Sequence, residues 1–262
     1  MTLYWVYDLP NWLFGTLVVV TFVVLATAGL FAARIIVKQV FGCHPHNDVI
    51  SYYLATVGVF YGITLGLISV GTYQTYSDLD QSVSLEAATV ASIYRDVSSY
   101  PEPTRSQLRG AIANYTRFTI EEAWPLQRRG VVPGVSVMNA LQSELDGFTP
   151  SNEREQIVHA EALRQFNHLV ELQRVRLQSV LTGLPAMLYG VILLGALVTM
   201  VMSWALVLDN FRMHVFLNAA LAALLGLLVF LIAAVDNPFR GEFSVGPDAF
   251  IVVRDQLMTP GQ

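Results

Sequence analysis

Charged residues are scarce in this chain of 262 residues. Asp, Glu, Lys and Arg make up 13% of it, whereas a soluble domain carries about a quarter. The charges are also clustered, so that four long intervals contain none. These intervals run between residues 8 and 34, 48 and 78, 176 and 209, and 212 and 236. Each is longer than the roughly 20 apolar residues with which a helix crosses a bilayer. The sequence therefore predicts a membrane protein and excludes a soluble enzyme.

Cysteine and the common catalytic motifs are also lacking. The single cysteine, Cys43, permits no internal disulfide, which excludes a secreted disulfide scaffold. A net charge of −5 argues against nucleic acid as a partner. The chain contains no P-loop, no HExxH and no GxSxG motif. We therefore expect neither an enzyme nor a cofactor.

Residue types that bind metals gather in the loop after the first apolar interval. They are Cys43, His44, His46 and Asp48. Pro45 separates the two histidines, and no second cluster completes a set of ligands. An ordinary exposed loop accounts for these residues more simply, so we expect no metal site.

The chain is predicted to be all-α, with a helical extramembrane domain between the second and third of its four spans. The spans must be helical because lipid offers no hydrogen-bond partner to the backbone. The spans are expected at about 12–33, 49–73, 185–208 and 213–235. The corresponding divisions are 1–77 (first transmembrane hairpin), 78–176 (helical domain), 177–235 (second hairpin) and 236–262 (C-terminal tail).

Apolar spacing predicts several helices within 78–176. The first should end at Pro101, and Thr104 with Gln107 resembles a capping box that starts the second, which Pro125 would end. A long helix should start at Asn152 and carry Leu163, Phe166, Val170 and Leu177 on one face. No glycine or proline interrupts 73–99 or 152–181, so both helices next to the membrane should continue from it into solvent. Such helices would couple the domain to the membrane or merely support it.

The side of the membrane that the domain occupies has two interpretations. Lys and Arg mark cytoplasmic loops, and Arg34 and Lys38 after the first span place the domain outside. Arg164, Arg174 and Arg176 beside the third span favour the cytoplasmic side instead.

The second span has two contrasting faces. Gly58, Gly62 and Gly66 recur every four residues and form a surface on which helices can pack closely. Nearly opposite lies a stripe of mixed aromatic and hydroxyl character, which we predict to line a pore. The stripe consists of Tyr53, Thr56, Phe60, Thr64, Leu67 and Gly71. A wall of this kind would gate by dewetting at an apolar constriction; the alternative is a helix packed on both faces, with no pore.

Four stretches together resemble the bestrophin-like family of bacterial membrane proteins, classed as a domain of unknown function. They are LEAATVASIYRDV (85–97), QLRGAIANYTRF (107–118), EEAWP (121–125) and DNPFRGEFSVGPDAF (236–250). The positions that match the family's characteristic ones are Glu86, Tyr94, Arg95, Tyr115, Trp124, Pro125, Asp236, Pro238, Phe239 and Gly241. Glu86 and Arg95 lie about 180° apart on one helix, so each needs a partner from another helix or subunit.

The family name implies a distant similarity to bestrophins, which are pentameric anion channels. That similarity implies a cytosolic domain and a pore lined by the second span. We therefore expect a homo-oligomer, by this resemblance a pentamer, that crosses the cell (inner) membrane several times and passes small inorganic ions passively. The alternative is a non-conducting membrane adaptor or sensor whose helical domain binds a partner.

Overall fold

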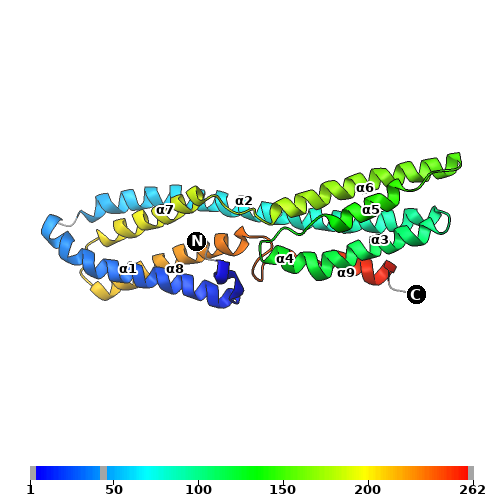
Figure 1. The fold of residues 1–262 in the computed structure, drawn as a ribbon. Coiled ribbons are helices and arrows are strands. Elements are labelled where there is room, and N and C mark those ends of the chain that lie inside the picture. Colours follow the sequence, from blue (N-terminus) through cyan, green and yellow to red (C-terminus); the bar gives the residue numbers. More distant parts are fainter. Residues whose placement is uncertain (1–3, 42–45, 259–262) are drawn as a thin grey trace. The chain divides into compact units, whose positions relative to one another are not determined.

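The computed structural model describes residues 4–41 and 46–258, and within these ranges the secondary structure is entirely helical. The helices of the first half are η1 (Tyr4–Asp8), α1 (Asn11–Phe41), α2 (Asn47–Asp96), η2 (Val97–Ser99), α3 (Thr104–Phe118), η3 (Thr119–Ala123) and α4 (Trp124–Arg128). Those of the second half are α5 (Ser136–Asp146), α6 (Glu153–Ser179), α7 (Ala186–Trp204), α8 (Phe211–Asp236), α9 (Asp248–Val253) and η4 (Arg254–Met258) (Figure 1).

Four helices are long and apolar enough to cross a membrane, which confirms the predicted all-α fold with four spans. The segments that qualify are Asn11–Ile35, Asn47–Ser99, Ala186–Trp204 and Phe211–Asp236. The chain divides into two compact units. The membrane unit comprises residues 1–74, 183–237 and 241–243, and the helical unit comprises 75–182, 238–240 and 244–262.

In the membrane unit, small residues allow the helices to approach one another. α1 packs along α8, where a Cβ at Gly226 would lie 3.0 Å from the Cα of Val19. α7 packs against both α1 and α8. α2 contacts α7 through Tyr61, whose hydroxyl donates to the carbonyl of Ile192 at 2.6 Å and whose ring covers Gly195. The core of this unit contains Ala26, Tyr61, Leu65, Ile192, Ala196, Met200, Ala222, Leu225, Val229 and Ile232.

The helical unit has its own apolar core. It is formed by one face each of the second half of α2, α3, α5 and α6, with Phe239, Val245 and Phe250 from the C-terminal tail. The predicted start of the long helix is confirmed, because the side chain of Asn152 accepts a hydrogen bond from the amide of Glu155 at 2.9 Å.

The predicted capping box at Thr104 is wrong. Thr104 is the first residue of α3 and its side chain caps nothing. The carboxylate of Glu102 instead accepts the backbone amide of Ser106 at 3.2 Å. Pro125 does not end the helix either. It lies in α4 directly after the π-helical turn η3, and such a turn displaces the carbonyl groups that a proline ring would otherwise clash with.

Only one of the two helices beside the membrane continues as predicted. α2 is unbroken over its 50 residues, but α6 ends at Ser179 and α7 begins at Ala186. Gly183 and Pro185 lie in the intervening segment, where proline both lacks an amide hydrogen and disfavours helix in the residue before it.

Candidate functional site: the exposed faces of α2 and the buried family motif

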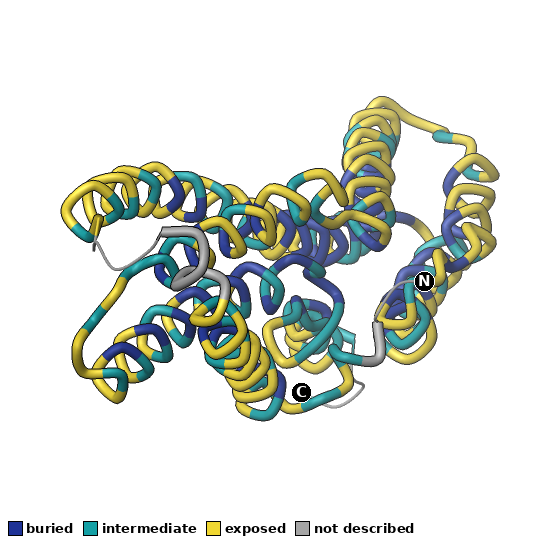
Figure 2. The backbone as a smooth tube through the Cα atoms, turned by 90° about the vertical axis from the view of Figure 1, so that its left-hand side faces the viewer, coloured by how far each residue is buried: buried dark blue, intermediate teal, exposed yellow. Residues whose placement is uncertain are grey.

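Most of the predicted pore stripe is exposed to the surroundings of the described chain. Phe60 and Leu67 are 69% and 70% exposed, and Tyr53 is 58% exposed. Thr56 and Gly71 are also exposed, and Thr64 is half-buried. Figure 2 marks exposed positions in yellow and shows how extensive they are along the helices.

The glycine face of α2 is also free. A Cβ built at Gly58, Gly62 or Gly66 would meet no described heavy atom within 4 Å. The helix contacts its own chain through a third face, on which Tyr61, Leu65 and Thr72 are buried.

Glu86 lies in a buried ion pair in the helical unit. Arg176 from α6 donates to it through Nε at 2.7 Å and Nη2 at 3.0 Å. The hydroxyl of Tyr115 from α3 donates to the same carboxylate at 2.6 Å. The side chains of Arg176 and Glu86 are 1% and 0% exposed. The motif therefore joins three helices at one carboxylate.

Aromatic rings enclose this ion pair. The guanidinium of Arg176 lies 5.3 Å from the ring centroid of Trp124 and 5.9 Å from that of Phe250. Trp124 also packs against Phe239, with the ring centroids 5.8 Å apart. Its indole N–H donates to the carbonyl of Val245 at 3.2 Å, which ties the tail to α4.

The electrostatics keep these groups in fixed protonation states. Burial is the largest single effect and lowers the pKa of Arg176, but the charges and hydrogen bonds of Glu86 and Tyr115 together raise that pKa above its ordinary value. Burial and the neighbouring Glu86 raise the pKa of Tyr115 well above 10. Arg176 thus stays a cation and Tyr115 a hydrogen-bond donor at physiological pH. Such an arrangement fixes helices and does not exchange protons.

The pairing of Arg176 with Glu86 was not predicted, because the two residues lie 90 positions apart in the chain. The predicted apolar face of α6 is partly right. Phe166 is buried and Leu163 packs against the core, but Val170 is exposed, and Leu169 and Leu172 are buried together with Arg176. The signal was present: Arg176 follows Leu169 by seven residues and therefore shares its face.

The DNPF stretch of the motif forms two sets of contacts. In the membrane unit, the carboxylate of Asp236 accepts from the backbone amide of Leu184 and from the hydroxyl of Tyr189 at 2.8 Å. Asn237 donates to the hydroxyl of Tyr7 at 2.7 Å. These contacts join α8 to the start of α7 and to η1. In the helical unit, the carbonyl of Pro238 accepts from the amide of Val245 at 2.8 Å.

Three further motif positions have simpler environments. Gly241 has φ of 80°, a conformation that side-chain-bearing residues rarely adopt. Tyr94 is half-buried under the guanidinium of Arg109, which lies 5.1 Å from its ring centroid. Arg95 is exposed.

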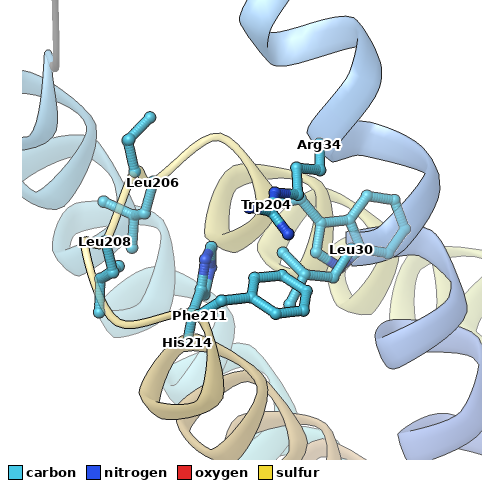
Figure 3. Close-up of a pocket in the computed structure, with 8 residues that line it drawn as sticks. Leu30, Arg34, Trp204, Leu206, Leu208, Phe211 and His214 are labelled. Carbon is cyan, nitrogen blue, oxygen red and sulfur yellow. The ribbon is translucent and has the colours of Figure 1, made fainter.

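No group of three or more His, Cys, Asp or Glu residues suited to a metal occurs within 4–41 and 46–258. Cys43 and His44 lie outside the described residues. The membrane unit contains a cavity of about 100 Å³ that is lined by residues from α1, the end of α7 and the start of α8 (Figure 3).

Comparison with known proteins agrees with this architecture. A family model for the bestrophin-like domain matches residues 18–250. The chain belongs to the bestrophin-like family. The match covers both hairpins and the helical unit, and it confirms the resemblance carried by the motif residues. No curated protein matched the sequence.

Solved structures of bestrophin homologs share the fold. One is a variant of a bacterial bestrophin homolog from Klebsiella pneumoniae. It is 15% identical, with 93% of this chain and 99% of that chain covered and a TM-score of 0.65. A second variant is 13% identical, with 92% and 99% covered and a TM-score of 0.68. A structure of the homolog phased with zinc is 15% identical, with 90% and 96% covered and a TM-score of 0.64.

Proposed function

We propose that this membrane protein assembles as a homo-oligomeric ion channel whose pore is lined by α2. The observation that carries the proposal is that α2 exposes both its glycine face and the large side chains of its stripe, Tyr53, Phe60 and Leu67. Membership of the bestrophin-like family supports the same function. We place the channel in the cell (inner) membrane, with the lipid bilayer and further copies of the chain as its partners and small inorganic ions as its cargo.

The angular arrangement of α2 suits a ring of subunits. At 100° per residue, the glycine face lies about 80° from the face that contacts α7. The stripe lies about 120° from the contact face and about 160° from the glycine face. A helix that lines a pore needs these three surfaces: one for its own subunit, one for a neighbour and one for the lumen.

The chemistry of the stripe favours an apolar, weakly coordinating wall. Thr56 donates its hydroxyl to the carbonyl of Tyr52 at 2.9 Å, and Thr64 donates to Phe60 at 2.8 Å. Each hydroxyl therefore presents lone pairs, and no hydrogen, toward the lumen. Together with Phe60, these groups would form a constriction that gates by dewetting.

Ion flux across liposomes that contain the purified protein tests whether this stripe lines the pore. Phe60→Ala should widen the constriction and raise flux, whereas Thr64→Trp should narrow it and lower flux. Phe216→Ala is the matched control, because Phe216 lies on α8 and is 66% exposed, much like Phe60. Unchanged flux in both α2 variants, with oligomer size preserved, would overturn the assignment of the pore to this stripe.

A second candidate function is a non-conducting adaptor or sensor. It is favoured by an apolar groove of about 520 Å³ in the helical unit, which a partner could occupy. The groove is lined by Val132, Val135, Val170, Gln173, Arg174, Leu177, Gln178 and Leu181. A monomer or dimer in solution would support this function, whereas a closed ring of four or more supports the channel.

A further inference from the structure

The cavity at the end of the membrane unit is enclosed by three helices and the loop that joins α7 to α8 (Figure 3). Arg34 enters it from α1, Trp204 from the end of α7, and Phe211 and His214 from α8. Its remaining lining is apolar: Leu30, Leu206, Val207 and Leu208. At about 100 Å³ it exceeds the roughly 30 Å³ share of one water molecule.

Hydrogen-bond donors at this cavity are not matched by acceptors. The indole Nε1 of Trp204 is buried and has no partner among the described residues. Arg34 lies 4.4 Å from the ring centroid of Phe211, and it takes part in none of the ion pairs found within 4–41 and 46–258. One helical turn beyond His214, the amide nitrogen of Asn218 is also buried without a partner in the described chain.

Two polar side chains at this end are already engaged. His214 Nε2 lies 3.0 Å from the carbonyl of Ser203 and must carry a hydrogen toward it, because a carbonyl only accepts. Asn218 Oδ1 accepts the hydroxyl of Ser203 at 2.7 Å. The cavity lining contains a guanidinium and an indole N–H without a partner and includes no carboxylate, a combination that favours an anion.

Among the possible anions, the position of the cavity in the membrane favours a phosphate. Arg34 is the first charged residue after the apolar part of α1, α7 ends at Trp204, and α8 begins at Phe211. The cavity therefore lies where three spans leave the hydrocarbon, at the depth of the lipid headgroups. Phosphate groups are the abundant anions there, and basic pockets between spans bind them.

We propose that this cavity is a phosphate-binding site in which Arg34 and the indole N–H of Trp204 hold the headgroup phosphate of a membrane phospholipid. The leucine side chains at its edge contact the glycerol and the first acyl carbons. The bound lipid bridges α1 to the α7–α8 loop and so stabilises that end of the bundle.

Lipid titration of the full-length, delipidated protein in detergent, followed by native mass spectrometry, tests the proposal. The probes are dioleoyl phosphatidylglycerol, dioleoylglycerol, which lacks the phosphate, and inorganic phosphate. Arg34→Gln should weaken phosphatidylglycerol binding about tenfold, in keeping with a lost charge-assisted hydrogen bond. Arg212→Gln is the matched control: Arg212 is exposed one residue into α8 and does not line the cavity, and its loss should change binding less than about twofold.

A second pair of variants leaves the charge of Arg34 in place. Trp204→Phe removes the indole N–H and should also weaken phosphatidylglycerol binding, whereas Trp12→Phe, at an indole that is 71% exposed, should not. Displacement of the lipid by millimolar inorganic phosphate would assign the site to the free anion and uphold its phosphate chemistry. Equal losses in Arg34→Gln and Arg212→Gln, or equal affinity of the wild-type protein for dioleoylglycerol, would overturn the proposal.

Discussion

Replacing Glu86 with glutamine should strongly destabilise the helical unit. The substitution leaves the guanidinium of Arg176 buried, at 1% exposure, with no counter-charge. It also replaces the acceptor of three hydrogen bonds between 2.6 and 3.0 Å. Breaking a buried pair in this way costs about 3–5 kcal/mol. For a domain of this size that corresponds to a fall in melting temperature of about 10 °C or more.

Thermal unfolding of the full chain in detergent, followed by circular dichroism, measures this effect. The control is Glu102→Gln at the exposed pair that Glu102 forms with Arg105 at 2.7 Å, which should change the melting temperature little. The double variant Glu86→Met with Arg176→Met should recover much of the loss, because an apolar pair leaves no buried charge. A double variant less stable than Glu86→Gln would refute this reasoning, as would a Glu86→Gln protein that melts like the wild type.

Three further outcomes follow from the structure. The folded chain holds the pKa of Tyr115 above 10, so at alkaline pH it keeps a proton that the unfolded chain loses, and stability should fall as pH rises above about 10. In Tyr115→Phe the melting temperature should fall less steeply over the same pH range. Gly62→Leu should reduce the oligomer on a sizing column, while Gly190→Leu, on α7 with open space around its Cβ, leaves it intact; equal elution of the two would contradict a subunit contact at the glycine face. Tyr189→Phe removes a 2.8 Å hydrogen bond to Asp236 and should lower the melting temperature by a few degrees, whereas an unchanged melting curve would show that the contact is not stabilising.

The sequence predicted the features that depend on local pattern. The spans followed from charge-free intervals, since desolvated charge is costly anywhere in a bilayer. The start of α6 followed from Asn152 and Glu155, which act within one helical turn. The resemblance to the bestrophin-like family followed from motifs that are contiguous in the chain.

Features that depend on distant contacts were not predicted. Arg176 pairs with a residue 90 positions away. Because Arg176 is charged, the buried face of α6 was predicted from apolar residues alone and did not include it. α3 begins at Thr104 as predicted, but its capping group was misassigned, because the carboxylate of Glu102, and not the hydroxyl of Thr104, accepts the free amide. The break between α6 and α7 was not predicted because Gly183 and Pro185 lie just beyond the uninterrupted stretch 152–181.

The most direct test of the central proposal is ion flux through the purified oligomer in liposomes, with chloride compared with potassium against protein-free vesicles. The proposal predicts flux above the control that Phe60→Ala and Thr64→Trp change in opposite directions. Absence of flux from a well-folded oligomer, across pH and calcium concentration, would contradict the channel and favour a helical unit that binds a partner.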